Sequence, residues 1–106
     1  MEQTKIRYLP TFYNDLEDAL NYISNVLMNK EAANSLLDEV ENAILSRSNN
    51  PEAFEKYNST KDRKNTYYKI YVKNYVIYYV VIHENPPIME IRRFLYNKRN
   101  RSRIVW

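Results

Sequence analysis

Arginine and lysine are concentrated between Ile88 and Trp106, so this stretch holds the residues best suited to bind or act on an anion. Six of the sixteen basic residues lie in these nineteen positions, and Glu90 is the only acidic residue among them. Charge of this density favours a phosphate backbone as the partner, and a run of like charge that simply faces solvent is the alternative. The six residues are Arg92, Arg93, Lys98, Arg99, Arg101 and Arg103.

Arg93 is distinguished by its position in a predicted strand from Ile88 to Leu95. Successive strand residues face opposite sides of a sheet, so Arg93 is expected to share a side with apolar neighbours rather than with Glu90 and Arg92. A guanidinium in that place needs an anionic partner, because an unpaired buried charge is very costly. The partner is either an acidic residue of the first half of the chain or an external phosphate. The apolar neighbours are Met89, Ile91 and Leu95.

Tyr96 follows this strand and lies close in sequence to Lys98 and Arg99. A hydroxyl, an aromatic ring and two cations therefore come together within four residues. These types can stack on a base, neutralise a phosphate and stabilise charge that develops during a reaction.

A second basic cluster lies near the end of the segment from Ser46 to Thr66, which has no sustained hydrophobic period. A connection of this length without regular structure is uncommon in a compact domain and is usually either functional or disordered. The cluster comprises Lys61, Arg63 and Lys64, and like charges in such proximity lower the pKa of a lysine toward that of a usable base. A flexible basic loop is the alternative.

Tyrosine is over-represented, with eleven residues in the chain. Tyr67, Lys69, Tyr71 and Lys73 alternate along one side of a predicted strand, where rings can stack on bases while the ammonium groups bind phosphates. Half-buried packing is the alternative, because tyrosine is favoured in strands in any case.

Missing residue types exclude several classes of chemistry. The chain has no cysteine, which excludes disulfides, thiolate metal sites and a thiol nucleophile. It also has no glycine, which removes phosphate-binding glycine loops and the dinucleotide fingerprint. A single histidine and no spaced set of carboxylates give no basis for a metal site. We therefore expect neither a metal nor a small-molecule cofactor.

Length and charge indicate one small domain, residues 1–106, with opposite charge in its two halves. Residues 1–55 carry four basic and ten acidic side chains, a net charge of −6, and residues 56–106 carry twelve and three, a net charge of +9. This asymmetry favours nucleic acid or an acidic protein as a partner of the second half. The longest apolar run is eight residues, too short to span a bilayer, so we expect a soluble cytoplasmic protein.

Two helices are predicted after a short strand, Lys5 to Leu9, that stops at Pro10. Apolar residues at three- and four-residue spacing predict a helix over residues 11–27, capped by Thr11, and a second helix after Asn29 that ends before the segment SRSNNP. The short connection between them predicts an antiparallel helical hairpin.

From Tyr67 the hydrophobic period becomes two. The segments YYKIYV and YVIYYVVI predict a β-hairpin around Lys73 and Asn74, with Asn74 supplying the left-handed conformation. The strand from Ile88 to Leu95 follows two prolines. The expected fold class is α+β, a helical hairpin packed on a mainly antiparallel four-stranded sheet in the order β-α-α-β-β-β, followed by a basic tail.

This order of elements, with YYKIYVKNYVIYYVV and MEIRRFLYNKRN, resembles the RelE/ParE superfamily of bacterial type II toxins. The tyrosine-rich hairpin and the arginine-rich ending RRFLYNKRN carry the resemblance, with Asn97 where that ending usually has glycine. Membership implies a growth inhibitor that is neutralised by a cognate antitoxin. It also implies plasmid stabilisation as a role.

The resemblance implies one of two targets. RelE-like members cut messenger RNA on the ribosome without a metal, and Arg93, Tyr96 and Arg99 then match the catalytic positions. Lys61, Arg63, Lys64, Lys69 and Lys98 would then bind nucleic acid. ParE-like members inhibit DNA gyrase and catalyse no reaction. Val76 stands where RelE nucleases carry an arginine. A hydrophobic residue at this position resembles the ParE pattern.

Overall fold

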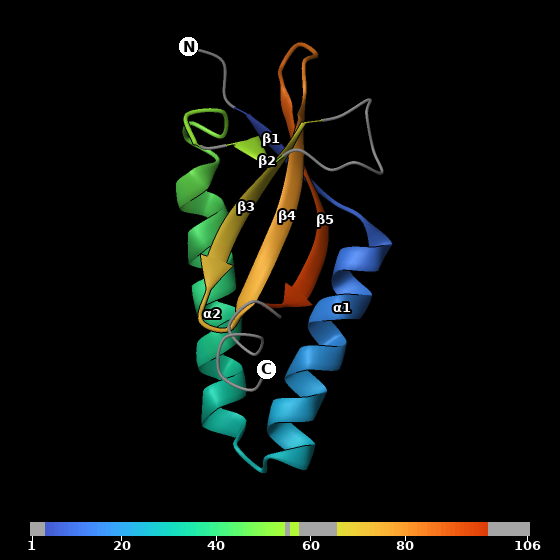
Figure 1. Cartoon of the computed structure of the whole chain (residues 1–106), viewed down its shortest axis with the longest axis vertical. Coiled ribbons are helices and arrows are strands. Elements are labelled where there is room, and N and C mark those ends of the chain that lie inside the picture. Colours follow the sequence, from blue (N-terminus) through green and yellow to red (C-terminus); the bar gives the residue numbers. More distant parts are fainter. Residues whose placement is uncertain (1–3, 55, 58–65, 98–106) are drawn as a thin grey trace.

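The computed structural model describes residues 4–54, 56–57 and 66–97. Two helices pack on one face of a mixed, mostly antiparallel sheet, which confirms the expected α+β class and order of elements (Figure 1). The sheet holds the four predicted strands and a two-residue fifth, in the order β1-β5-β4-β3-β2. In chain order the elements are β1 (Lys5–Tyr8), α1 (Pro10–Asn21), a π-helical turn (Tyr22–Val26), α2 (Lys30–Arg47), β2 (Lys56–Tyr57), β3 (Tyr67–Val72), β4 (Tyr75–Ile82) and β5 (Ile88–Tyr96).

Both helices begin where the chain changes direction, but only one cap was predicted correctly. The N-cap of α1 is Leu9 and not Thr11; Pro10 opens the helix, where its missing N–H costs nothing. Asn29 caps α2 as predicted, because its side-chain oxygen accepts a hydrogen bond from the amide of Ala32 at 3.0 Å. The helix predicted as continuous to residue 27 changes to a π-helical turn at Tyr22. In the described ranges, neither helix combines the length and apolar character needed to cross a bilayer.

The sheet is built around β4 and β5, with β1 joining β5 in parallel. The hairpin between β3 and β4 turns at Lys73 and Asn74 as predicted, but Lys73 adopts the left-handed conformation, with φ of 53°. Asn74 instead accepts a backbone hydrogen bond from the amide of Asn97 at 2.7 Å, which joins the turn to the end of β5.

The segment from Ser46 to Thr66 is less irregular than its composition indicated. The helix α2 continues to Arg47, and β2 pairs antiparallel with β3. The prediction of irregular structure was therefore wrong at these positions. Pairing with a distant strand supplied hydrogen bonds that local propensity does not reveal. Residues 58–65 lie outside the described part of the chain.

The core lies between the helices and the face of the sheet that they cover. Phe12 of α1, Leu36 of α2, Ile77 of β4 and Met89 of β5 are each at most 1% exposed. Together with the other members of this core they fix the sheet against the helical hairpin.

Candidate functional site

A β-bulge in β5 decides where the two neighbouring arginines point. Tyr79 pairs with Ile91 and Tyr78 pairs with Arg93, so Arg92 is an extra residue in this strand. The bulge shifts the alternation by one position, which places Arg92 and Arg93 on the same, outer face of the sheet. The prediction that Arg93 shares a face with Met89 and Ile91 was therefore wrong.

Arg93 is held by an acidic residue of the first helix. Its Nε and Nη2 donate to the two carboxylate oxygens of Asp15 at 2.7 and 3.0 Å, and the amide of Phe94 donates to the same carboxylate at 3.0 Å. Hydrogen bonding to Asp15 raises the pKa of the Arg93 guanidinium, against the smaller effect of burial. Of the two partners expected for Arg93, the structure thus shows the internal acidic residue. Asp15 also accepts a hydrogen bond from the backbone of β5 at Phe94, where β1 no longer pairs with this strand.

A second arginine cluster, which we call the Glu90 clamp, comprises Arg7, Glu90, Arg92 and Tyr67. One carboxylate oxygen of Glu90 accepts from Nε of Arg7 at 2.9 Å, and the other accepts from Nε of Arg92 at 2.9 Å. Arg92 also donates to the hydroxyl of Tyr67 at 2.9 Å. Burial pushes the pKa of Glu90 upward, but the hydrogen bonds and charges of the two arginines outweigh it, so this pKa lies below its usual value.

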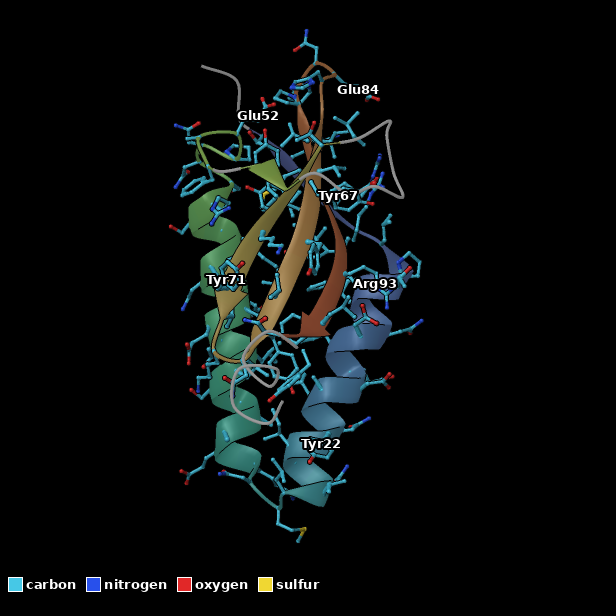
Figure 2. The ribbon with its side chains drawn as sticks, viewed as in Figure 1. Tyr22, Glu52, Tyr67, Tyr71, Glu84 and Arg93 are labelled. Atoms are coloured by element: carbon cyan, nitrogen blue, oxygen red, sulfur yellow. The ribbon has the colours of Figure 1, made fainter. Side chains whose placement is uncertain are left out.

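Tyr67 and Tyr71 of β3, labelled in Figure 2, lie on this same outer face, and Lys69 alternates with them along the strand. Nζ of Lys69 lies 6.0 Å from the ring centroid of Tyr71 and 5.8 Å from that of Tyr78, within reach of cation–π attraction. Tyr71 is 55% exposed, whereas Tyr67 is covered by the guanidinium of Arg92. Lys73 does not continue the row, because it lies in the turn and pairs with Glu39 of α2 at 3.1 Å.

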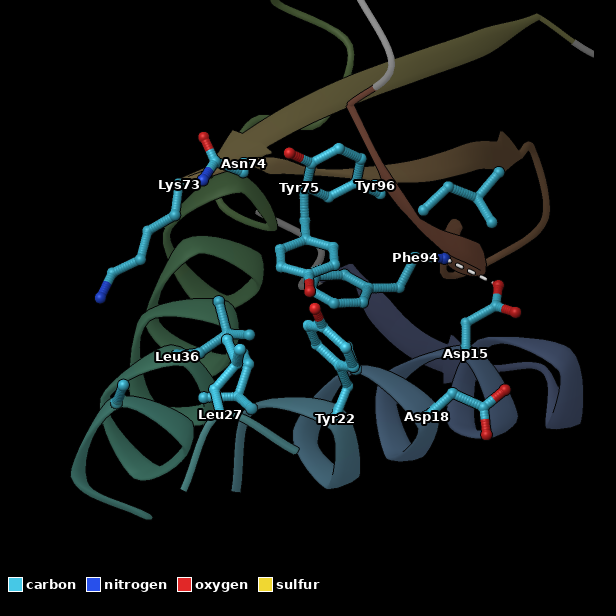
Figure 3. A pocket seen from close by; sticks show the side chains of 14 residues that line it. Asp15, Asp18, Tyr22, Leu27, Leu36, Lys73, Asn74, Tyr75, Phe94 and Tyr96 are labelled. Carbon is cyan, nitrogen blue, oxygen red and sulfur yellow. Dashed lines mark hydrogen bonds between the residues drawn. The ribbon is translucent and has the colours of Figure 1, made fainter. Parts of the chain in front are cut away.

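Tyr96 lies on the helix side of the sheet, so the structure does not bring it together with Arg93. Its ring meets that of Tyr75 edge-on, with the centroids 5.6 Å apart. Both rings line a groove of about 860 Å³ between the helical hairpin and the β3–β4 turn. Figure 3 shows the rings of Tyr22, Tyr75 and Phe94 gathered in this groove, with Asp18 at its side.

Large apolar side chains are exposed where the helical hairpin turns, next to the groove. Val26, Leu27 and Met28 are 65%, 55% and 81% exposed, and Tyr22 is 51% exposed. Met28 has φ of 54°, an uncommon conformation for a residue with a β-carbon. Exposed apolar surface beside an apolar groove is typical of a protein–protein interface.

Five of the predicted binding or catalytic residues fall outside the described part of the chain. They are Lys61, Arg63, Lys64, Lys98 and Arg99. In the ranges that the structure does describe, no group of three or more histidine, aspartate or glutamate side chains is arranged to hold a metal.

Three residues of the site were missed by sequence reasoning, namely Arg7, Asp15 and Glu90 in their roles as ion-pair partners. Arg7 and Glu90 are adjacent only because β1 pairs in parallel with β5, which places them opposite one another. The lone acidic residue in a basic strand was the available signal, because a buried carboxylate requires cations nearby.

Nearly the whole chain matches the model of a known protein family. The family model described as "ParE toxin of type II toxin-antitoxin system, parDE" matches residues 6–101. No curated protein matches the chain. The match covers the helical hairpin, the tyrosine-rich strands and the arginines of β5.

Proposed function

Because the chain belongs to the ParE toxin family, we propose that it arrests growth by binding and inhibiting DNA gyrase, without catalysing a reaction. It is the toxin of a ParDE type II toxin-antitoxin system, and the family implies a cognate antitoxin. A cytoplasmic location, where gyrase acts, is part of this proposal. Ribosome-dependent cleavage of messenger RNA, the activity of RelE-like relatives, is the competing function.

The observation that carries the proposal is the environment of Val76. This residue is 3% exposed and lies between Tyr71 and Leu95 on the neighbouring strands. RelE-like nucleases are expected to carry an arginine here, which would neutralise the phosphate under attack. A buried valine provides no charge and no hydrogen-bond donor, which supports binding rather than phosphate cleavage.

The positions of Arg93 and Tyr96 support the same choice. Cleavage without a metal requires the catalytic groups to converge on one phosphate, because positioning supplies much of the rate. Arg93 is engaged by Asp15 on the outer face, while Tyr96 lines the groove on the helix side. A catalytic role for Arg93, Tyr96 and Arg99 remains a prediction of the competing function.

Purified toxin tests the target directly. We expect it to block supercoiling of relaxed plasmid by gyrase and to leave messages intact in a coupled translation reaction whose RNA ends are mapped. Unaffected gyrase together with new, toxin-dependent RNA ends would overturn the proposal in favour of the nuclease.

We also infer that the antitoxin covers the groove and the exposed apolar residues beside it. An amphipathic helical segment fits such a surface, because its apolar side chains would remove Tyr22 and Leu27 from water. Leu27→Asp is expected to weaken antitoxin binding about tenfold or more, since it would place a charge in an apolar interface. Glu17→Gln, an exposed position on α1, is the control and is expected to bind normally.

A further inference from the structure

The two edges of the sheet differ in how their backbone groups are used. At one edge, β2 pairs with the start of β3, and the next carbonyl of β3, that of Lys69, accepts a hydrogen bond from Nη1 of Arg47 at 3.1 Å. At the other edge, β1 pairs with β5, and within the described ranges no strand lies beyond it. The β3 edge is thus partly closed, whereas the β1 edge is open along its length.

Four backbone groups of β1 are directed outward at this edge. The amides of Lys5 and Leu9 both donate to carbonyls on the β5 side, at 2.9 and 3.0 Å. Because alternate residues of a strand direct their hydrogen-bonding groups to opposite sides, the N–H and C=O groups of Ile6 and Tyr8 point away from β5. The part of the chain that the structure describes supplies no partner for these four groups, so they can pair with an added strand.

The side chains of β1 differ between the two faces of the sheet. Lys5 and Arg7 are exposed on the outer face, and Lys5 has no acidic partner among the described residues. Ile6 and Tyr8 are half-buried on the helix side. There the ring of Tyr13, which is 54% exposed, lies 5.5 Å from that of Tyr8. A strand placed along β1 would therefore meet cations on one face and an exposed aromatic ring on the other.

A second copy of this chain fits the β1 edge poorly. Antiparallel pairing about a two-fold axis brings Ile6 or Tyr8 opposite one of the same two residues, because only these present outward hydrogen-bonding groups. With Ile6 opposite Tyr8, Arg7 faces the same arginine of the other copy, and with Ile6 opposite Ile6, Lys5 faces Arg7. Like charges directly opposite one another are destabilising, so the edge favours an acidic partner over itself. The remaining register, Tyr8 opposite Tyr8, pairs only that residue of β1.

We propose that β1 accepts an extended segment of the antitoxin as an additional strand, with an acidic side chain opposite Lys5 and apolar side chains toward Tyr8 and Tyr13. Backbone hydrogen bonds to Ile6 and Tyr8 supply affinity in this binding mode, and the alternating side chains supply selectivity. The occupant is the antitoxin, the partner that the family implies, so this inference rests on the proposed function while concerning a surface other than the groove.

Hydrogen exchange of the toxin's backbone amides, followed by NMR with and without the cognate antitoxin, tests this inference. In the free toxin the amides of Ile6 and Tyr8 are expected to exchange fast, because they have no acceptor. Saturating antitoxin is expected to slow both about tenfold or more. The amide of Glu52, in the exposed connection between α2 and β2 near the opposite edge of the sheet, is the reference and is expected to change less than about twofold.

Lys5→Gln separates the side-chain contact from the backbone pairing. In calorimetric titrations it is expected to weaken antitoxin binding about threefold, the scale of one exposed ion pair, and Lys5→Arg is expected to retain the wild-type affinity. Asn42→Asp lowers the net charge by the same amount at an exposed position of α2 and is the matched control, expected to bind as the wild type does.

Three results would overturn the proposal. An antitoxin that binds while Ile6 and Tyr8 exchange at the free rate would exclude an added strand. Protection of these two amides in the free toxin that increases with its concentration would show pairing between copies of the chain instead. Equal losses for Lys5→Gln and Asn42→Asp would exclude the acidic contact. Because gyrase is absent from both experiments, their outcome is independent of whether the toxin inhibits it.

Discussion

The two faces of the sheet use nearly the same residue types for different purposes. Tyr68 and Tyr71 belong to one strand, yet Tyr68 is 2% exposed and stacks on Tyr79, while Tyr71 is 55% exposed. The covered face is apolar and closed by the helices, whereas the outer face combines rings with arginines and one buried carboxylate. The covered face thus contributes most of the free energy of unfolding. The outer face holds its charges in fixed positions and contributes less.

The largest effect is expected on the covered face. Ile77→Ala removes a fully buried side chain and should lower the free energy of unfolding by about 2–5 kcal/mol, because it leaves a cavity in the core. Urea denaturation measures this loss. Val26→Ala, at a 65% exposed position, is the control and should change it by less than about 0.5 kcal/mol. Similar losses in both variants would contradict the division between core and surface.

The Glu90 clamp is expected to give the next largest effect. Glu90→Gln leaves two arginines without their shared counter-charge and should cost about 1–2 kcal/mol, less than a fully buried pair because Arg7 is half exposed. The pKa of Glu90 is lowered by folding, so its stabilisation is present above the unfolded value near 4.3 and is lost as the pH falls through the folded value. Wild type should therefore lose stability in acid more steeply than the variant. Parallel pH profiles would show that the clamp contributes little.

Asp15 should give a smaller loss. Asp15→Asn weakens two hydrogen bonds from Arg93 and one from the Phe94 amide, and should cost about 1 kcal/mol. Arg93→Ala should lower the free energy of unfolding by less, because the hydrogen bond from the Phe94 amide to Asp15 remains. A double-mutant cycle by thermal unfolding measures the coupling between the two side chains, and strictly additive losses would mean that the pair is not coupled.

The smallest effect is expected at Tyr71. Tyr71→Ser should change the free energy of unfolding by less than about 0.5 kcal/mol, since the side chain is more than half exposed. Its melting temperature by circular dichroism should match the wild type. A large destabilisation would show that the ring supports the sheet.

Much of the fold followed from local pattern, and much of the site did not. Neighbours in the sequence determine the apolar stripe of α2, its Asn29 cap and the hairpin at Lys73 and Asn74. Hydrophobic periodicity and local residue types therefore predicted these features. The side of the sheet occupied by Arg93 depends on a bulge, which an uninterrupted alternation cannot reveal. Its partner Asp15 comes from a helix that packs against the strand only after folding.

By itself, the sequence determined the order of elements, the amphipathic helices, the absence of cysteine and glycine chemistry, and the accumulation of positive charge in the second half. Each of these depends on composition or on residues a few positions apart. The tertiary structure alone decided that Arg93 is neutralised, that Tyr96 faces the groove, and that Arg7 meets Glu90 across two parallel strands. Those outcomes depend on pairing between distant segments, since strand register and bulges determine which side chains share a face.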